Sequence, residues 1–168
     1  KSAAKFLLQK CRNWKNKKIN ILELAGTANS SIAVSRAEGF RYLIDKDSRF
    51  NFIHSEDGDF LRSRGKEIMD KIILQNGGLK IGNQNIDVIF SHNDPMTLGL
   101  LESLEENKIT SNKTVIISID AEQESIDSLK EGKLNCVVEC NPNLGPTLMD
   151  LVEKVASGEE IPRTTYMK

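Results

Sequence analysis

Short apolar runs alternate with longer amphipathic stretches along the whole chain. Five of the runs are too short for helices and rich in β-branched residues, so each predicts a strand. They cover residues 19–24, 50–54, 86–90, 114–119 and 135–140, and residues 163–167 allow a final short strand. Helical spacing of apolar residues predicts helices over residues 2–9, 96–106 and 125–130, after Ser30 or Ser31, from Gly58-Asp59 and from Pro142. The alternation predicts an α/β fold with a doubly wound, mostly parallel five-stranded sheet and right-handed crossovers.

The most informative junction follows the third apolar run. Ser91, His92, Asn93 and Asp94 place four polar side chains where a buried strand ends. Asp94-Pro95 then predicts a helix start, with Asp94 as the N-cap and Pro95 in the first turn. In open α/β sheets, ligands bind at the carboxyl ends of the strands. This junction therefore predicts a small-molecule site.

The other predicted strands end in polar residues as well. If the sheet is parallel, all these carboxyl ends share one edge of the sheet. The segments that meet there are residues 24–27, 55–60, 91–94, 120–122 and 139–141. Carboxylates and amides exchange hydrogen bonds with vicinal hydroxyl groups, and an aromatic ring covers the apolar face of a sugar. The edge therefore suits a polyhydroxylated ligand.

Composition and charge narrow the function classes. The 168 residues fit one ordinary domain, and 39% hydrophobic with 28% charged residues is typical of a globular protein. A net charge of −1 gives no electrostatic reason to expect a nucleic-acid surface. No apolar run approaches the roughly 20 residues that a membrane span needs.

The cysteines and histidines form no metal or catalytic pattern. Cys136 and Cys140 lie about 13 Å apart along a predicted strand, too far for an unstrained disulfide. His92 beside Asp94 is only a weak metal pair, and His54 on its apolar strand is expected to be a core residue. A catalytic triad and a glycine-rich phosphate loop are both absent from the sequence. We therefore expect no metal, no cofactor and no enzymatic activity.

Five segments carry a resemblance to a known family. They are GTANSSIAVSRAEGF (26–40), GDFLRSRGKEIM (58–69), SHNDPMTLGLLESL (91–104), ISID (117–120) and VECNPNLGP (138–146). In this order and spacing they resemble the periplasmic sugar-binding proteins of the ribose/galactose type. These are the solute receptors of ABC importers, and they share a fold with LacI-type ligand domains. The chain is most similar to the galactofuranose-binding type, and the match covers the C-terminal lobe.

The resemblance implies sugar contacts on the first two motifs. Arg36, before the Ala-Glu-Gly-Phe signature, corresponds to an arginine that bonds a sugar hydroxyl or ring oxygen. Phe60 matches the aromatic residue that stacks on the sugar, and Thr27 matches a position that often lines the pocket. Two other interpretations remain open: Arg36 as a surface ion-pair partner of Glu38 or of a neighbouring lobe, and Phe60 as a hydrophobic staple at a helix start.

The remaining motifs imply three further contacts. Asn93 and Asp120 match residues that bind sugar hydroxyls, and Glu139 is favoured over Cys140 as a polar contact at the last strand. A buried amide such as that of Asn93 needs partners, and a ligand is the natural one. For Asp120 the alternative is a cap on the helix at residues 122–130.

The resemblance also implies a missing lobe. These receptors trap the sugar between two lobes by hinge closure. Residues 1–140 would form the C-terminal lobe, and residues 141–168 a crossover helix and tail that pack on the absent N-terminal lobe. Because the chain begins at Lys1, without Met and inside a predicted helix, we expect an excised piece of a longer protein. The orphan C-terminal helix makes a homodimer plausible.

The expected function is therefore monosaccharide binding by the solute-binding component of a sugar ABC transporter. We expect the protein to lie outside the cytoplasm, with the sugar and a membrane permease as its partners. We expect no nucleic acid to contact this segment. The alternative is the sugar-sensing domain of a membrane receptor or of a cytoplasmic LacI-type transcriptional regulator.

Overall fold

The structure is a computed structural model that describes residues 1–15 and 17–165. Its centre is a five-stranded sheet of order β2-β1-β5-β6-β7, in which every pairing is parallel. The strands are β1 (Ile19–Ala25), β2 (Phe50–Asp57), β5 (Val88–Ser91), β6 (Val115–Asp120) and β7 (Cys136–Glu139). A separate small hairpin pairs β3 (Lys80–Ile81) with β4 (Gln84–Asn85). The predicted doubly wound parallel sheet is confirmed.

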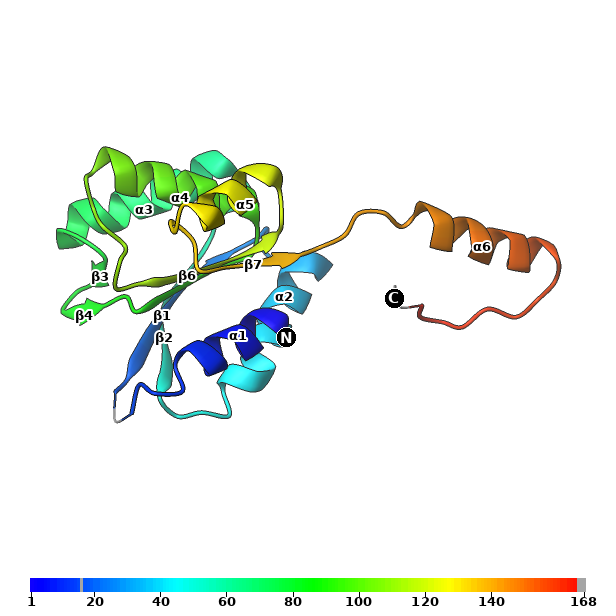
Figure 1. Ribbon diagram of the computed structural model, residues 1–168, viewed down its shortest axis with the longest axis horizontal. Helices are drawn as coiled ribbons and strands as arrows, with labels where there is room; N and C mark the ends of the chain where they lie inside the picture. The colour runs from blue at the N-terminus through cyan, green and yellow to red at the C-terminus, as the bar shows by residue number, and fades with distance from the viewer. Residues whose placement is uncertain (16, 166–168) are drawn as a thin grey trace.

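Helices cover both faces of the sheet (Figure 1). On one face lie α1 (Ser2–Lys10) and α2 (Ser31–Ile44), and on the other lie α3 (Arg62–Asn76), α4 (Asp94–Glu106) and α5 (Gln123–Lys130). Two apolar clusters separate the layers because neighbouring strand residues point to opposite faces. Ile21 of β1 joins the α1–α2 cluster with Leu7, Phe40 and Phe90, whereas Leu22 joins Ile68, Met96 and Leu100 on the α3–α4 side.

The strand order reverses between β1 and β5. From β1 the chain passes outward to β2, then returns across β1 to build β5, β6 and β7 on the other side. Ligands bind at such a reversal in open α/β sheets, because the loops at the carboxyl ends of the two central strands diverge there. In this chain that position lies between the Gly26 loop and the residues after Ser91.

Two helix starts differ from the sequence prediction. Asn93, not Asp94, is the N-cap of α4, because its side-chain oxygen accepts a hydrogen bond from the Met96 N–H at 3.1 Å. Helix α3 begins at Arg62 rather than at Gly58-Asp59. Leu61 therefore precedes the helix as its N-cap residue and is 54% exposed. The start of α4 was mispredicted because two residues that favour the N-cap position are adjacent. The start of α3 was mispredicted because a polar turn precedes the helix.

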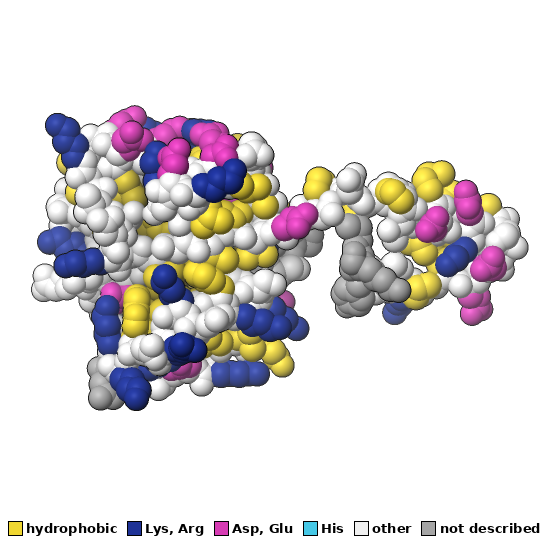
Figure 2. Space-filling view, in the orientation of Figure 1, with side chains coloured by type: hydrophobic (Ala, Val, Ile, Leu, Met, Phe, Trp, Pro, Cys, Tyr) yellow, Lys and Arg dark blue, Asp and Glu magenta, His cyan; other side chains and the backbone are white. Residues whose placement is uncertain are grey.

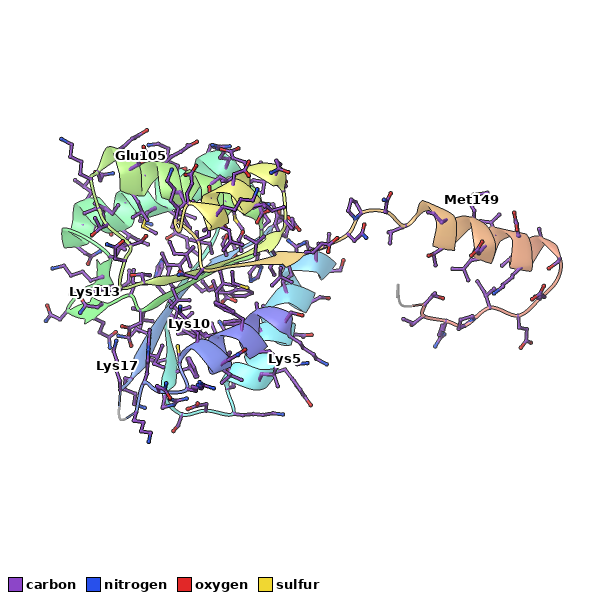
Figure 3. The ribbon with its side chains drawn as sticks, in the orientation of Figure 1. Lys5, Lys10, Lys17, Glu105, Lys113 and Met149 are labelled. Carbon is purple, nitrogen blue, oxygen red and sulfur yellow. The ribbon has the colours of Figure 1, made fainter. Side chains whose placement is uncertain are left out.

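Helix α6 (Gly145–Ala156) stands away from the rest of the molecule (Figure 1). It begins three residues after the predicted start at Pro142. Its apolar side chains are exposed (Figure 2), and Met149 lies far from the sheet (Figure 3). In the predicted strand at residues 163–167, residues 163–165 are not a strand and the last two lie outside the described residues. None of the helices described is long and apolar enough to cross a membrane.

Candidate functional site

Arg36, in the second turn of α2, links the carboxyl ends of two strands. Its Nη2 donates to Asp120 Oδ1 at 2.6 Å, and its Nη1 donates to the main-chain carbonyl of His92. The Arg36 side chain is 15% exposed and that of Asp120 is 26% exposed, so the pair is open to one side. Because guanidinium has five N–H donors, Arg36 can still donate to a ligand. The alternative of an ion pair with Glu38 is wrong, because the carboxylate that pairs with Arg36 is that of Asp120.

Phe60 lies beside this pair in an unusual backbone conformation. Asp59 and Phe60 have φ angles of 51° and 60°, in the left-handed region that side chains other than glycine rarely adopt. The Phe60 ring lies directly over Gly26, where an added Cβ would be only 2.0 Å from the ring, and its centroid is 5.7 Å from Arg36 Cζ. The staple alternative is wrong, because the N4 position that a staple needs is Gly65.

Asn93 is buried and connects Phe60 to α4. Its Nδ2 donates to the Phe60 carbonyl at 2.9 Å, while its Oδ1 caps α4. The protein itself therefore supplies partners for this amide, which weakens the expectation that a ligand must do so. One amide hydrogen and one oxygen lone pair remain available beyond these two bonds.

Carboxylates gather at the end of β6. Asp94 is fully buried, accepts hydrogen bonds from the Ser118 hydroxyl and from the Glu122 N–H (2.7 Å), and is not the cap of α4. Burial, reinforced by the charge of Asp94, raises the pKa of Asp120 despite its bond to Arg36. Helix α5 has Glu122 as N-cap with no side-chain cap bond, so Asp120 does not cap it.

The last two predicted contacts lie farther out on the same edge. Glu139 is exposed on the edge strand β7, with its Cα in register with Asp120. Thr27 is exposed in the loop after β1, and its carbonyl accepts a hydrogen bond from the Ser30 N–H at 3.1 Å. The structure thus joins Arg36, Phe60, Asn93 and Asp120 through direct contacts, and leaves Thr27 and Glu139 at the periphery.

A hollow of about 430 Å³ adjoins Arg36. It lies between the starts of α1 and α2 and the ends of β6 and β7, and its walls include Phe40, Phe90, Ile119 and Val138. Phe60, Asn93 and Asp120 do not line it. The candidate site is therefore the polar edge next to this hollow.

The roles of two residues were missed from the sequence. Gly26 lies under the Phe60 ring, and the His92 carbonyl accepts a hydrogen bond from Arg36. Both residues stand in segments that the sequence predicts at this edge, 24–27 and 91–94, but their contacts depend on the fold. His54, predicted to be a core residue, has a side chain that is instead 35% exposed and hydrogen-bonded to Glu56 at 3.0 Å.

Within residues 1–15 and 17–165, no three His, Cys, Asp or Glu side chains form a group that could hold a metal ion.

A doubly wound parallel sheet with a polar edge at its strand reversal defines a class, the open α/β proteins that bind a ligand at this reversal. The profile of one family, described as the periplasmic binding protein domain, matches residues 1–160. The chain belongs to this family. The relatives that it matches are substrate-binding transport proteins and not enzymes.

The chain is 32% identical to the galactofuranose-binding protein YtfQ of Escherichia coli K12 over 148 residues, which cover 87% of this chain and 45% of that protein. It is 35% identical to a Mycobacterium smegmatis protein in complex with β-D-fucofuranose, with a TM-score of 0.82, covering 96% of this chain and 51% of that one. A galactofuranose-binding protein superposes with a TM-score of 0.86 at 29% identity, over all of this chain and 55% of that one. The chain thus spans about half the length of these relatives.

Proposed function

We propose that this chain is one lobe of a solute-binding protein and binds one face of a monosaccharide at the carboxyl edge of its sheet. The observation that carries the proposal is the fixed position of Arg36, which is held by Asp120 and the His92 carbonyl beside the Phe60 ring. A guanidinium, a carboxylate and an aromatic ring in contact are complementary to vicinal hydroxyls and an apolar sugar face. Three relatives are named for, or hold, a furanose sugar, which supports a furanose ligand.

Each side chain has a distinct proposed role. Arg36 donates to a ring or hydroxyl oxygen, Asp120 accepts from a hydroxyl group, and Phe60 covers the sugar ring. Asn93 offers its second amide hydrogen while it holds the Phe60 main chain in place. At the periphery, Glu139 and Thr27 contact the ligand or the rim of the cleft.

The second face of the sugar is assigned to another lobe. Residues 1–140 form the lobe described above, and residues 141–168 are proposed to cross over and pack on the partner lobe. The support is the unpartnered apolar face of α6, on which Leu148, Val152 and Val155 are each at least 50% exposed. Burial of such side chains contributes about 1.5–3 kcal/mol each, so this face is stable only when it is covered.

The proposed receptor binds its sugar outside the cytoplasm and delivers it to the membrane permease of an ABC importer. The support is the family, whose related members are import binding proteins. A binding rather than catalytic role also fits the site, where Arg36 and Asp120 neutralise each other in an ion pair.

The test is calorimetric titration of the full-length protein with furanose and pyranose sugars. We expect wild type to bind a furanose sugar, and Arg36→Met to weaken binding at least tenfold, because a charged hydrogen-bond donor to the sugar is lost and Asp120 loses the partner that holds it. Arg64→Met is the matched control, because Arg64 is a partly exposed arginine of α3 that pairs with Glu67 on the same helix. Equal affinities for both variants, or no binding by wild type, would overturn the proposal.

A further inference from the structure

Glu23 is a buried carboxylate in the otherwise apolar strand β1. The residue is 3% exposed and has three hydrogen-bond partners, one from α2, one from β2 and one from the loop after β5. Its Oε2 accepts from Arg41 of α2 at 2.6 Å and from Ser55 of β2 at 3.0 Å, and its Oε1 lies 3.3 Å from His92 Nε2. A buried charge costs several kcal/mol unless it is paired, so these contacts hold the carboxylate in one orientation.

The His92 ring is held on both sides. The Gly26 N–H donates to His92 Nδ1 at 3.2 Å, which places the ring proton on Nε2, toward Glu23. The ring also packs against Phe90, with centroids 5.2 Å apart, and its side chain is only 1% exposed. The imidazole is therefore too deeply buried to touch a ligand, and its contacts are with the main chain and with Glu23.

The main-chain groups next to the His92 ring also position the two proposed sugar contacts, Arg36 and Phe60. The His92 carbonyl accepts the hydrogen bond that orients Arg36. The Gly26 N–H belongs to the residue directly under the Phe60 ring. One imidazole thus ties the ends of β1 and β5 together at the strand reversal, beneath both side chains.

We propose that Glu23 is a positioning residue of the sugar site: through the His92 imidazole it fixes the main chain at Gly26 and His92, and so sets Arg36 and Phe60 in place. It does not contact the sugar. This inference rests on the proposed function, and it adds the buried residue that makes the polar edge rigid before ligand arrives. A site that is ordered in advance avoids the entropy cost of ordering its side chains on binding.

The test compares variants of the full-length protein by nitrogen NMR of the His92 ring, by NMR of the Arg36 guanidinium, and by sugar titration. In wild type we expect the ring proton on Nε2 and a restrained Arg36. Glu23→Ala removes the acceptor, so we expect the proton to distribute over both nitrogens, Arg36 to become mobile, and sugar affinity to fall about tenfold. Glu23→Gln keeps an acceptor for Nε2 and should retain the tautomer and lie within about threefold of wild-type affinity.

Glu56→Ala is the matched control, because Glu56 also pairs with a histidine, His54, on the neighbouring strand β2. It should leave the His92 tautomer, Arg36 and affinity unchanged. If Glu23→Ala fails to fold, His92→Phe keeps the ring volume without its hydrogen bonds and should lower affinity by a similar factor. An unchanged tautomer and Arg36 signal in Glu23→Ala, or wild-type affinity in His92→Phe, would overturn the inference. If wild type binds no sugar, the proposed function fails, whereas the two NMR readouts still decide whether Glu23 positions Arg36.

Discussion

Replacing Gly26 by alanine displaces the Phe60 ring without changing the ring itself. The added Cβ would lie 2.0, 2.2 and 2.4 Å from three ring carbons, whereas carbon atoms in contact are about 3.5–4.0 Å apart. The ring must therefore move by roughly 1.5–2 Å. Because the ring is the end of a flexible side chain, we expect a stability cost at the low end of the about 1–3 kcal/mol typical of overpacking.

The larger expected effect of Gly26→Ala is on ligand binding. A displaced ring no longer covers the sugar face, and loss of an aromatic contact of this kind costs about 1 kcal/mol, or about fivefold in affinity. Alanine keeps the N–H that donates to His92, so that hydrogen bond survives the substitution. The assay is calorimetric titration of the full-length protein, with urea unfolding to measure stability.

A double-mutant cycle with Phe60→Ala provides the control. Phe60→Ala removes the three atoms nearest to the added Cβ, so Gly26→Ala should cost no further affinity in the Phe60→Ala background. Equal losses of affinity with and without the ring would refute the proposal that Gly26 acts through Phe60. Unchanged affinity of Gly26→Ala alone would refute the stacking role of Phe60.

Three further predictions concern stability and assembly. Burial by itself raises the pKa of Glu23, but hydrogen bonds from His92, Arg41 and Ser55 outweigh it and lower the pKa from 4.5 to about 2. The ionised carboxylate therefore adds about 3 kcal/mol to the free energy of unfolding above pH 4.5, and this contribution is lost as the pH falls toward 2. Urea unfolding at several pH values should show this loss in wild type and a smaller one in Glu23→Gln, and equal slopes would contradict it. Gly99→Ala should lower stability by about 1–3 kcal/mol in thermal unfolding, because its Cβ would lie 2.0 Å from a carbonyl oxygen of α3; an unchanged melting temperature would show that the two helices separate freely. The 168-residue chain alone should self-associate through α6 in sedimentation, and the double variant Leu148→Glu, Val152→Glu should be a monomer. A monomeric wild-type chain would contradict the proposal that the apolar face of α6 needs a partner.

The architecture was predictable because it depends on patterns that are local in the sequence. Five apolar runs separated by helical stretches are enough to indicate a parallel sheet, and its carboxyl edge follows from that topology. Ser30 was one of two predicted caps for α2, and its hydroxyl does accept from the Ala33 N–H. A glycine after a helical apolar stripe is typical of a helix end, and Gly77 ends α3 in the left-handed conformation.

The details of the site depend on contacts that a local pattern does not contain. Asn93 rather than Asp94 caps α4, and the Asp94 carboxylate instead accepts a hydrogen bond from Ser118, which is distant in the sequence. The partners of Glu23 lie 18, 32 and 69 residues away in the sequence, so its burial could not be deduced from one acidic residue in an apolar run. The left-handed backbone at Phe60 likewise depends on its bond to Asn93 and on the space over Gly26.

The most direct measurement is a crystal structure of the full-length protein with a bound furanose sugar. We expect sugar hydroxyl or ring oxygens within hydrogen-bond distance of Arg36 and Asp120, and the sugar ring against Phe60, with the Glu23–His92–Gly26 contacts unchanged. A sugar bound elsewhere, with Arg36 still paired only to Asp120 and the His92 carbonyl, would contradict the assignment of this edge as the binding site.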